Sequence, residues 1–270
     1  MRIILAGPGR AGMSLGLAFR DAGHELVGVL GRESTGEAAG RLATVELSWD
    51  ELLPAADLLV ISVRDDAIGE IADRLAPRAI GVGAAVHVSG SVPVGALAPL
   101  ADVGLPIGGF HPLQSLPEPR VGAIRLDGAW VGVGATDEGL HDRLVELGRS
   151  IGMVPFDLPD RARPLYHAGA SAAANYLVGC LALAERLFAA AGVPWEAAWP
   201  LVDAVVKNAT ELGPDRALTG PIARGDVATV EHQRAAIREA APELEAGFVD
   251  IGRAVAHLAG RAEEFGSVLE

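Results

Sequence analysis

Residues 2–17 read RIILAGPGRAGMSLGL, and this stretch decides the fold of the first half of the chain. Its first five residues are mostly apolar and predict a short buried strand. Gly7, Gly9 and Gly12 follow at once, and the helical pattern Ala11–Ala22 begins inside the loop. In such a strand–loop–helix unit the first glycine permits a tight turn, the second lets a ligand approach the backbone, and the third lets helix and strand pack closely.

This loop has the spacing that binds the pyrophosphate of a dinucleotide. The backbone N–H groups at the start of the helix are free to bind phosphate oxygens, and the helix dipole favours negative charge there. The spacing alone is weak evidence, but a strand directly before it and a helix directly behind it make it specific. The predicted binding residues are Gly7, Pro8, Gly9, Arg10, Ala11 and Gly12.

The end of the second predicted strand indicates which dinucleotide binds. Arg32 and Ser34 follow that strand and suit the 2′-phosphate of NADP, the arginine by charge and the serine by a hydrogen bond. Glu33 leaves NAD open, because an acidic residue there would hold the ribose hydroxyls instead. NADP is the favoured cofactor, and Val63 and Ser89, at the ends of later strands, are predicted to contact it.

Short apolar runs alternate with helical stretches through the first half of the chain, which is typical of a parallel sheet with crossover helices. From Tyr166 onward every segment has a helical pattern. The sequence therefore predicts a doubly wound Rossmann-type α/β domain over residues 1–158 and an all-helical domain, for substrate and dimerisation, over residues 159–270. The predicted strands are Arg2–Ala6, Glu25–Leu30, Asp57–Val63, Ala79–Val88, Pro106–Phe110, Ala129–Val133 and Val154–Asp157.

Composition excludes several classes of function. The formal net charge of −13 argues against nucleic acid and against an anionic membrane surface. The single cysteine and the histidine spacing favour no metal site. No leader segment is apparent, so we expect a cytoplasmic protein. The apolar stretch Ala168–Ala184 is short for a membrane span and predicts a buried core helix, and too few helices follow it to cover it within one chain. A homodimer is therefore expected.

Other segments carry a family resemblance. Together with the glycine loop, they resemble a Rossmann-like family whose helical half is a domain of unknown function; the segments are His87–Ser91, Gly109–Ser115, Asn175–Leu177 and Ala217–Asp226. The chain is more distantly similar to pyrroline-5-carboxylate reductases, ketopantoate reductases and the 6-phosphogluconate dehydrogenase group. Some members of the closer family are ketopantoate reductases, which act in pantothenate biosynthesis, so the resemblance implies a reductase.

Hydride transfer to a ketone or imine needs a proton donor, and the first helix of the second half offers candidates. His167, Ser171 and Asn175 recur every four residues and predict a polar stripe on an apolar helix. Ketopantoate reductases place a lysine and an asparagine four residues apart on a comparable helix. This chain has no lysine there, which makes His167 the favoured donor and Lys207, its only lysine, the alternative.

Three further residues are predicted to reach the substrate. His111 and Gln114 lie in the Gly-Phe-His-Pro-Leu-Gln segment, after a predicted strand whose end is expected to face ligands. Arg224 would bind a carboxylate, and Asp226 is expected to cap the next helix. Structural roles for all of these polar residues remain open at this stage.

The favoured function is an NADP-dependent oxidoreductase acting on a small keto or imino carboxylate, with 2-dehydropantoate (ketopantoate) as the best single substrate. Two alternatives remain open. One is a dinucleotide-binding sensor without turnover, which the missing helix lysine favours. The other is a reductase that exchanges hydride between NADP and a deazaflavin.

Overall fold

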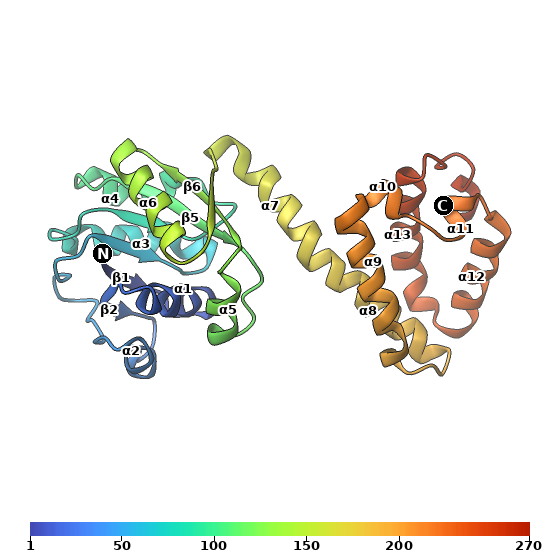
Figure 1. Cartoon of the computed structure of the whole chain (residues 1–270), viewed down its shortest axis with the longest axis horizontal. Coiled ribbons are helices and arrows are strands. Elements are labelled where there is room, and N and C mark those ends of the chain that lie inside the picture. The colour runs from blue at the N-terminus through green and yellow to red at the C-terminus, as the bar shows by residue number, and fades with distance from the viewer. The chain divides into compact units, whose positions relative to one another are not determined.

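The computed structural model describes residues 1–270 and divides into two compact units, Met1–Ser171 and Ala172–Glu270. The first unit is built on a seven-stranded sheet in the order β2-β1-β3-β4-β5-β6-β7 (Figure 1). The strands are β1 Arg2–Ala6, β2 Glu25–Leu30, β3 Leu58–Ile61, β4 Ala85–His87, β5 Ile107–Leu113, β6 Trp130–Ala135 and β7 Val154–Asp157.

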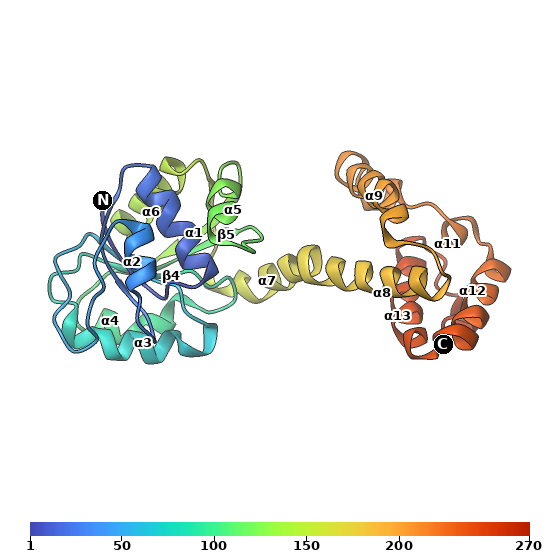
Figure 2. The ribbon, with the colours of Figure 1, turned by 90° about the horizontal axis from the view of Figure 1, so that it is seen from below.

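Helices cover both faces of this sheet (Figure 2), so the predicted doubly wound α/β fold is confirmed. Alternate strand residues point to opposite cores: Ile3 and Leu5 pack on one side of β1, and Ile4 and Ala6 on the other. The helices of this unit are α1 Arg10–Asp21, α2 Gly36–Leu42, α3 Ile68–Leu75, α4 Ala98–Asp102, α5 Pro119–Arg125, α6 Glu138–Ser150 and α7 Arg163–Ser171.

Two features of the sheet differ from the sequence prediction. The strand predicted over Ala79–Val88 is wrong in its first half, because only Ala85–His87 is a strand and the preceding residues form turns. Ala79 and Val82 are nevertheless buried, and burial alone produced the apolar pattern. The sheet is also not wholly parallel, since β6 pairs antiparallel with β5.

The second unit is all helical, as predicted. Its helices are α8 Leu177–Ala190, α9 Trp199–Leu212, α10 Pro214–Ala217, α11 Pro221–Arg224, α12 Val227–Ala240 and α13 Glu245–Leu258 (Figure 1). A core that includes Val230, Val249 and Phe265 holds α12 and α13 against the chain end. The unit begins with a π-helical segment, Ala172–Tyr176, which directly follows α7.

The apolar helical stretch is not buried within the chain. Asp160–Ala190, 31 residues with mean hydropathy 1.2 over its most apolar window, is long and apolar enough to cross a membrane by length and composition, and none of that window is buried. The prediction of a buried core helix over Ala168–Ala184 is therefore wrong for a single chain. Many of its side chains are exposed, including Tyr176 and Val178, although Leu183 packs against the core cluster of Ile237, Ala241 and Leu244.

Candidate functional site

The glycine loop joins β1 to α1, and two of its glycines are required by the fold itself. Gly7 has φ +96°, and a Cβ there would lie 2.3 Å from the carbonyl oxygen of Ser62 at the end of β3. At Gly12 a Cβ would lie 2.2 Å from the carbonyl oxygen of Gly7. Side chains at either position would push the loop or α1 away from the sheet.

Gly9 is different because nothing in the protein explains it. Its φ is −73°, which any residue adopts, and a Cβ built on it meets no atom within 4 Å. It is the N-cap of α1, and no side chain caps the helix there. The first amides of α1 therefore face open space with their hydrogen-bonding capacity free, which is the arrangement that anions occupy. Arg10 is exposed beside it.

The loop lies where the strand order reverses. The chain runs from β1 to β2 on one side and then to β3 on the other, so the carboxyl ends of β1 and β3 share one edge. Ser62 is buried there, and Val63 is half-buried, with Cγ1 2.8 Å from the Cβ position of Gly7. Ligands of open α/β sheets bind at this switch point.

The segment after β2 carries the residues predicted to select the cofactor. Arg32, Glu33 and Ser34 are all exposed. The Ser34 hydroxyl donates to the carboxylate of Glu46 at 3.4 Å, and the Thr35 N–H donates to the same carboxylate at 2.6 Å. Sequence reasoning missed Glu46, because it comes after α2 and only the folded chain brings it beside Ser34.

A second polar cluster lies at the ends of β4 and β5. Ser89 is buried, and its N–H donates to Nδ1 of His87 at 3.2 Å. The Ser91 hydroxyl donates to Asp65 at 2.5 Å and lies 3.3 Å from the Ser89 hydroxyl. The side chains of His87 and Asp65 thus hold the Ser-Gly-Ser turn that follows β4.

Helix α7 adds two aromatic side chains to this cluster. Nδ1 of His111 lies 2.7 Å from the Tyr166 hydroxyl, and the rings of His111 and His167 are 6.3 Å apart. A Cβ on Gly90 would lie 2.8 Å from Nε2 of His111 and 2.9 Å from Cδ2 of His167. Gly90 therefore leaves room for both imidazoles. Contrary to the prediction that it follows a strand, His111 lies inside β5, paired with Gly132.

Burial sets the protonation states in this cluster. Burial, aided by the positive charges of His167 and Arg163, lowers the pKa of His111 to about 4. Burial raises the pKa of Tyr166 to about 12. At neutral pH the structure therefore holds a neutral imidazole against a protonated phenol.

Arg163 ties the start of α7 to the β4 turn and is fully buried. Its Nε donates to Asp160 at 2.8 Å and its Nη1 donates to the carbonyl of Ser89 at 3.0 Å. Asp160 also accepts from the N–H of Val94 at 3.0 Å. A Cβ at Gly109 would collide with the guanidinium, so that glycine admits the arginine. Sequence reasoning missed Arg163, because Asp160, Ser89 and Gly109 surround its guanidinium only in the folded chain.

The remaining predicted residues do not join this cluster within the first unit. Gln114 is exposed, and its amide contacts the backbone of Arg125 and Ser115 instead. Ser171 ends α7 and is half-buried. Asn175 lies in the π-helical segment, so the regular helix that the four-residue stripe requires extends only to Ser171.

The second unit contains the other predicted residues. Lys207 is 73% exposed and lies 3.9 Å from Glu211, as expected of a surface helix pair. Arg224 is exposed at the end of α11. Asp226 caps α12 by accepting from the Thr229 N–H at 3.1 Å, which confirms its predicted structural role.

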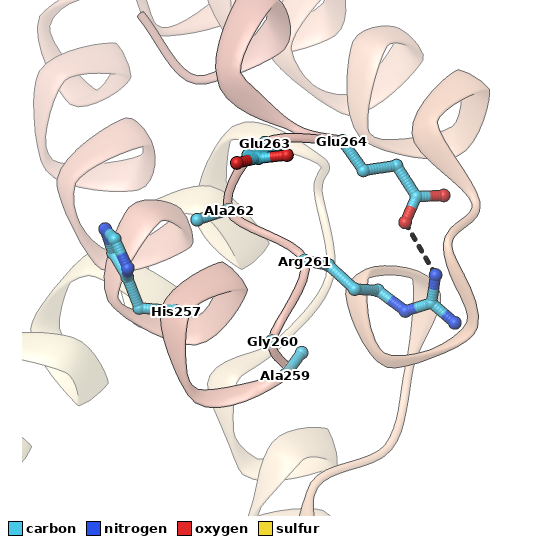
Figure 3. Close-up of a pocket in the computed structure, with 7 residues that line it drawn as sticks. All are labelled: His257, Ala259, Gly260, Arg261, Ala262, Glu263 and Glu264. Carbon is cyan, nitrogen blue, oxygen red and sulfur yellow. Dashed lines mark hydrogen bonds and ion pairs between the residues drawn. The ribbon is translucent and has the colours of Figure 1, made fainter.

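A hollow in the second unit is a poor candidate for the site. It is lined by His257 and by residues 259–264 (Figure 3), and it contains none of the predicted residues. Arg261 and Glu264 pair with each other at 2.6 Å, and Arg261 also donates to the carbonyl of Ala223. Its principal cation is therefore already used to hold the fold together.

Two known domain families match the sequence of this chain. A Rossmann-like domain model matches residues 1–112, and the model described as "Domain of unknown function (DUF2520)" matches residues 129–255. The chain joins a Rossmann-like domain to a DUF2520 domain. The family resemblance seen in the sequence is thereby confirmed. No curated protein matches the sequence significantly.

Solved structures share this fold over nearly their whole length. A provisionally named NADP oxidoreductase from Bacteroides fragilis is 22% identical, with TM-score 0.81, covering 95% of this chain and 98% of that one. An imine reductase from Streptomyces aurantiacus is 17% identical, with TM-score 0.70 and coverage of 100% and 98%. Pyrroline carboxylate reductase from Plasmodium falciparum, solved with NADP bound, is 12% identical, with TM-score 0.64 and coverage of 98% of each chain. At these identities the likeness establishes the fold.

Proposed function

We propose that this Rossmann–DUF2520 protein is an NADP-dependent oxidoreductase that reduces the C=O or C=N group of a small carboxylate. The observation that carries the proposal is Gly9, a residue without a side chain where the fold has room for one, at the uncapped start of α1. Room that the protein leaves unfilled beside free backbone N–H groups suits a pyrophosphate. The similar solved structures, named as an NADP oxidoreductase and as two reductases, support the same reaction class.

The residues present fit a dinucleotide. The pyrophosphate would lie on the backbone of residues 7–12, with Arg10 exposed beside it, and Arg32 would bind the 2′-phosphate. Val63 and Ser89 follow the carboxyl ends of β3 and β4 on the same edge of the sheet and would line the path toward the nicotinamide. When bound, the nicotinamide supplies the hydride; the protein must supply the proton and the orientation of the substrate.

The cluster at β4, β5 and α7 can orient the substrate and stabilise the charge that develops on it. With the Tyr166 hydroxyl donating to Nδ1 of His111, the neutral imidazole carries its proton on Nε2, beside Gly90. This N–H would stabilise negative charge that develops on a substrate oxygen or nitrogen. His167 lies next to it and is the side chain that would donate the proton. Arg163 and Asp160 hold the turn after β4 against the start of α7.

A substrate panel tests this function. NADPH is mixed with the protein and with 2-dehydropantoate, other 2-keto acids or cyclic imino acids, and loss of the reduced nicotinamide absorbance is followed. We expect turnover on at least one carboxylate and none on its methyl ester. Tight NADPH binding with no turnover on any compound would overturn the enzyme and favour a dinucleotide-binding sensor.

NADP selectivity follows from Arg32. A charge-assisted hydrogen bond to the 2′-phosphate is worth roughly 1.5–3 kcal/mol, or about tenfold or more in affinity. NADPH should therefore bind at least about tenfold more tightly than NADH. In Arg32→Ala, calorimetric titration should show the two affinities converging through loss of NADPH affinity; an unchanged preference would remove Arg32 from the site.

We also propose that the helical unit pairs with a second copy of the chain. Val178 on α8 and Leu201 and Val205 on α9 are each more than half exposed, and such an extent of apolar surface is costly in water. A second copy of the same helices would cover it. Light scattering should show twice the mass of 27.8 kDa at micromolar concentration. A monomer in buffer, or a protein found only in the membrane fraction, would contradict the pairing.

A further inference from the structure

The segment that carries Glu46 is fixed along the edge of the sheet. Val29 of β2 donates its N–H to the carbonyl of Val45 at 3.0 Å and accepts from the N–H of Leu47 at 2.9 Å. Leu47 packs directly over Gly28, where a Cβ would lie 2.3 Å from its side chain. Two backbone hydrogen bonds and one packed side chain therefore hold Glu46 in register beside the end of β2.

The carboxylate of Glu46 occupies the hydrogen-bond donors of the turn after β2. It accepts from the Thr35 N–H at 2.6 Å and from the Ser34 hydroxyl at 3.4 Å. The same turn packs against the glycine loop: a Cβ on Gly31 would lie 2.4 Å from Thr35 and 3.2 Å from Pro8. A negative group of the protein thus lies at the edge of the proposed cofactor site, on donors two and three residues after Arg32 in the same turn.

Trp49 fixes the other end of this segment. Its indole N–H donates to the carbonyl of Gly31 at 2.6 Å, and the Arg74 guanidinium lies 4.5 Å from the ring centre. Residues 45–49 are therefore held at both ends against the turn. Glu46 has little freedom to withdraw its charge from the turn by moving the backbone.

We infer that Glu46 is a specificity-determining residue whose carboxylate competes with the adenosine 2′-phosphate for the Ser34 and Thr35 donors. The inference rests on the proposed function, since it assumes that a dinucleotide binds at the glycine loop. A 2′-phosphate approaching Arg32 must displace the Glu46 carboxylate from these donors or share them with it, and the two groups repel each other. Because Glu46 is exposed, solvent screens the repulsion, and the effect on affinity is several-fold.

Two nucleotides that differ only in the 2′-phosphate test this. Adenosine 2′,5′-bisphosphate and adenosine 5′-monophosphate are titrated calorimetrically into the full chain, into Glu46→Gln and into Glu51→Gln, a charge-matched control at an exposed position. The amide of Glu46→Gln keeps an acceptor for the Thr35 N–H but removes the charge. We expect it to tighten the bisphosphate by about three- to tenfold and to change the monophosphate by less than about twofold, with Glu51→Gln unchanged for both.

The possible results separate the inference from the proposed function. Unchanged or weaker bisphosphate binding in Glu46→Gln, with normal binding to the unsubstituted chain, would overturn the role of Glu46 alone. Weaker monophosphate binding would also overturn it, because the carboxylate would then be holding the ribose hydroxyls. If neither nucleotide nor NADPH binds the unsubstituted chain, the proposed function itself fails.

Discussion

The glycine loop and the cluster around His111 prepare for a ligand in opposite ways. The loop offers backbone N–H groups and works by having no side chains, and all of its parts lie between Gly7 and Gly12. The cluster offers side chains, and the two that form its central hydrogen bond, His111 and Tyr166, are 55 residues apart in sequence. Adding a side chain should therefore impair the function of the loop. Removing a side-chain group, or protonating a histidine, should impair the cluster.

The largest expected effect is on turnover. Tyr166→Phe removes the hydroxyl that orients His111 and should lower the turnover rate by about 10²–10³, the scale for losing one preorganised donor. NADPH affinity should not change, because the glycine loop is untouched. Tyr176→Phe, at the only other tyrosine, is the matched control, since that side chain is exposed and has no hydrogen-bond partner in the structure.

The pH profile of the turnover rate, measured for Tyr166→Phe and His167→Gln, distinguishes the roles of His111 and His167. His111 titrates at about 4 and Tyr166 at about 12, so neither should produce a change in turnover near neutrality. A transition near neutral pH that disappears in His167→Gln, together with full activity in Tyr166→Phe, would show that His167 acts on the substrate without the His111 hydrogen bond.

The next expected effect is a difference in unfolding free energy between alanine substitutions at Gly7 and at Gly9. Gly7→Ala forces a side chain into the left-handed region and against Ser62, which should cost at least about 1–3 kcal/mol of unfolding free energy. Gly9→Ala should change stability by no more than about 0.5 kcal/mol, because its Cβ meets nothing. Denaturant unfolding measures both. Equal losses in the two variants would mean that Gly9 also serves the fold.

Acid should lower the folding stability of the unit that contains the cluster around His111. The folded pKa values of His87 and His111 are about 4, below the ordinary value of 6.5. Between these values the unfolded chain binds protons that the folded unit does not, so stability falls as pH drops from about 6.5 to about 4. Each histidine contributes at most about 1.4 kcal/mol per pH unit. His111→Gln should flatten this slope, and a slope identical to that of the unsubstituted chain would argue against its burial.

The smallest effect belongs to the second unit. Asp226→Ala removes the cap of α12 and should cost about 0.5–2 kcal/mol. Cofactor affinity should stay the same, because the loop and the cluster lie in the first unit. A loss of NADPH binding in this variant, measured by calorimetry beside its unfolding curve, would show that the cofactor site depends on the helical unit.

The sequence predicted the glycine loop better than the cluster around His111. The loop was predicted residue by residue, because a strand, a turn and a helix in succession are fixed by local sterics. Of the cluster, the sequence indicated Ser89, His111 and His167, but not Tyr166, which contacts His111, or Arg163, which donates to Asp160 and to the carbonyl of Ser89. Those contacts form only when α7 packs on the ends of β4 and β5, and no local periodicity encodes that packing.

The helix stripe shows a second limit. The four-residue spacing from His167 through Asn175 predicted a regular α-helix, and it did not predict the π-helical segment Ala172–Tyr176. Likewise Ala79 and Val82 are apolar because they are buried, although neither lies in a strand: Val82 forms only an isolated bridge with Ala56. Patterns of apolar residues report burial, and the backbone conformation that achieves it has to be determined separately.

Titration of NADPH into the unsubstituted chain and into Gly9→Ala is the most direct test of the central claim, which is that the glycine loop binds a dinucleotide. The account predicts saturable binding to the unsubstituted chain. It predicts affinity at least about tenfold weaker in Gly9→Ala, whose unfolding curve is unchanged, because the added methyl group fills space that the pyrophosphate needs. Equal NADPH affinity in the two proteins, or no binding to the unsubstituted chain, would contradict it.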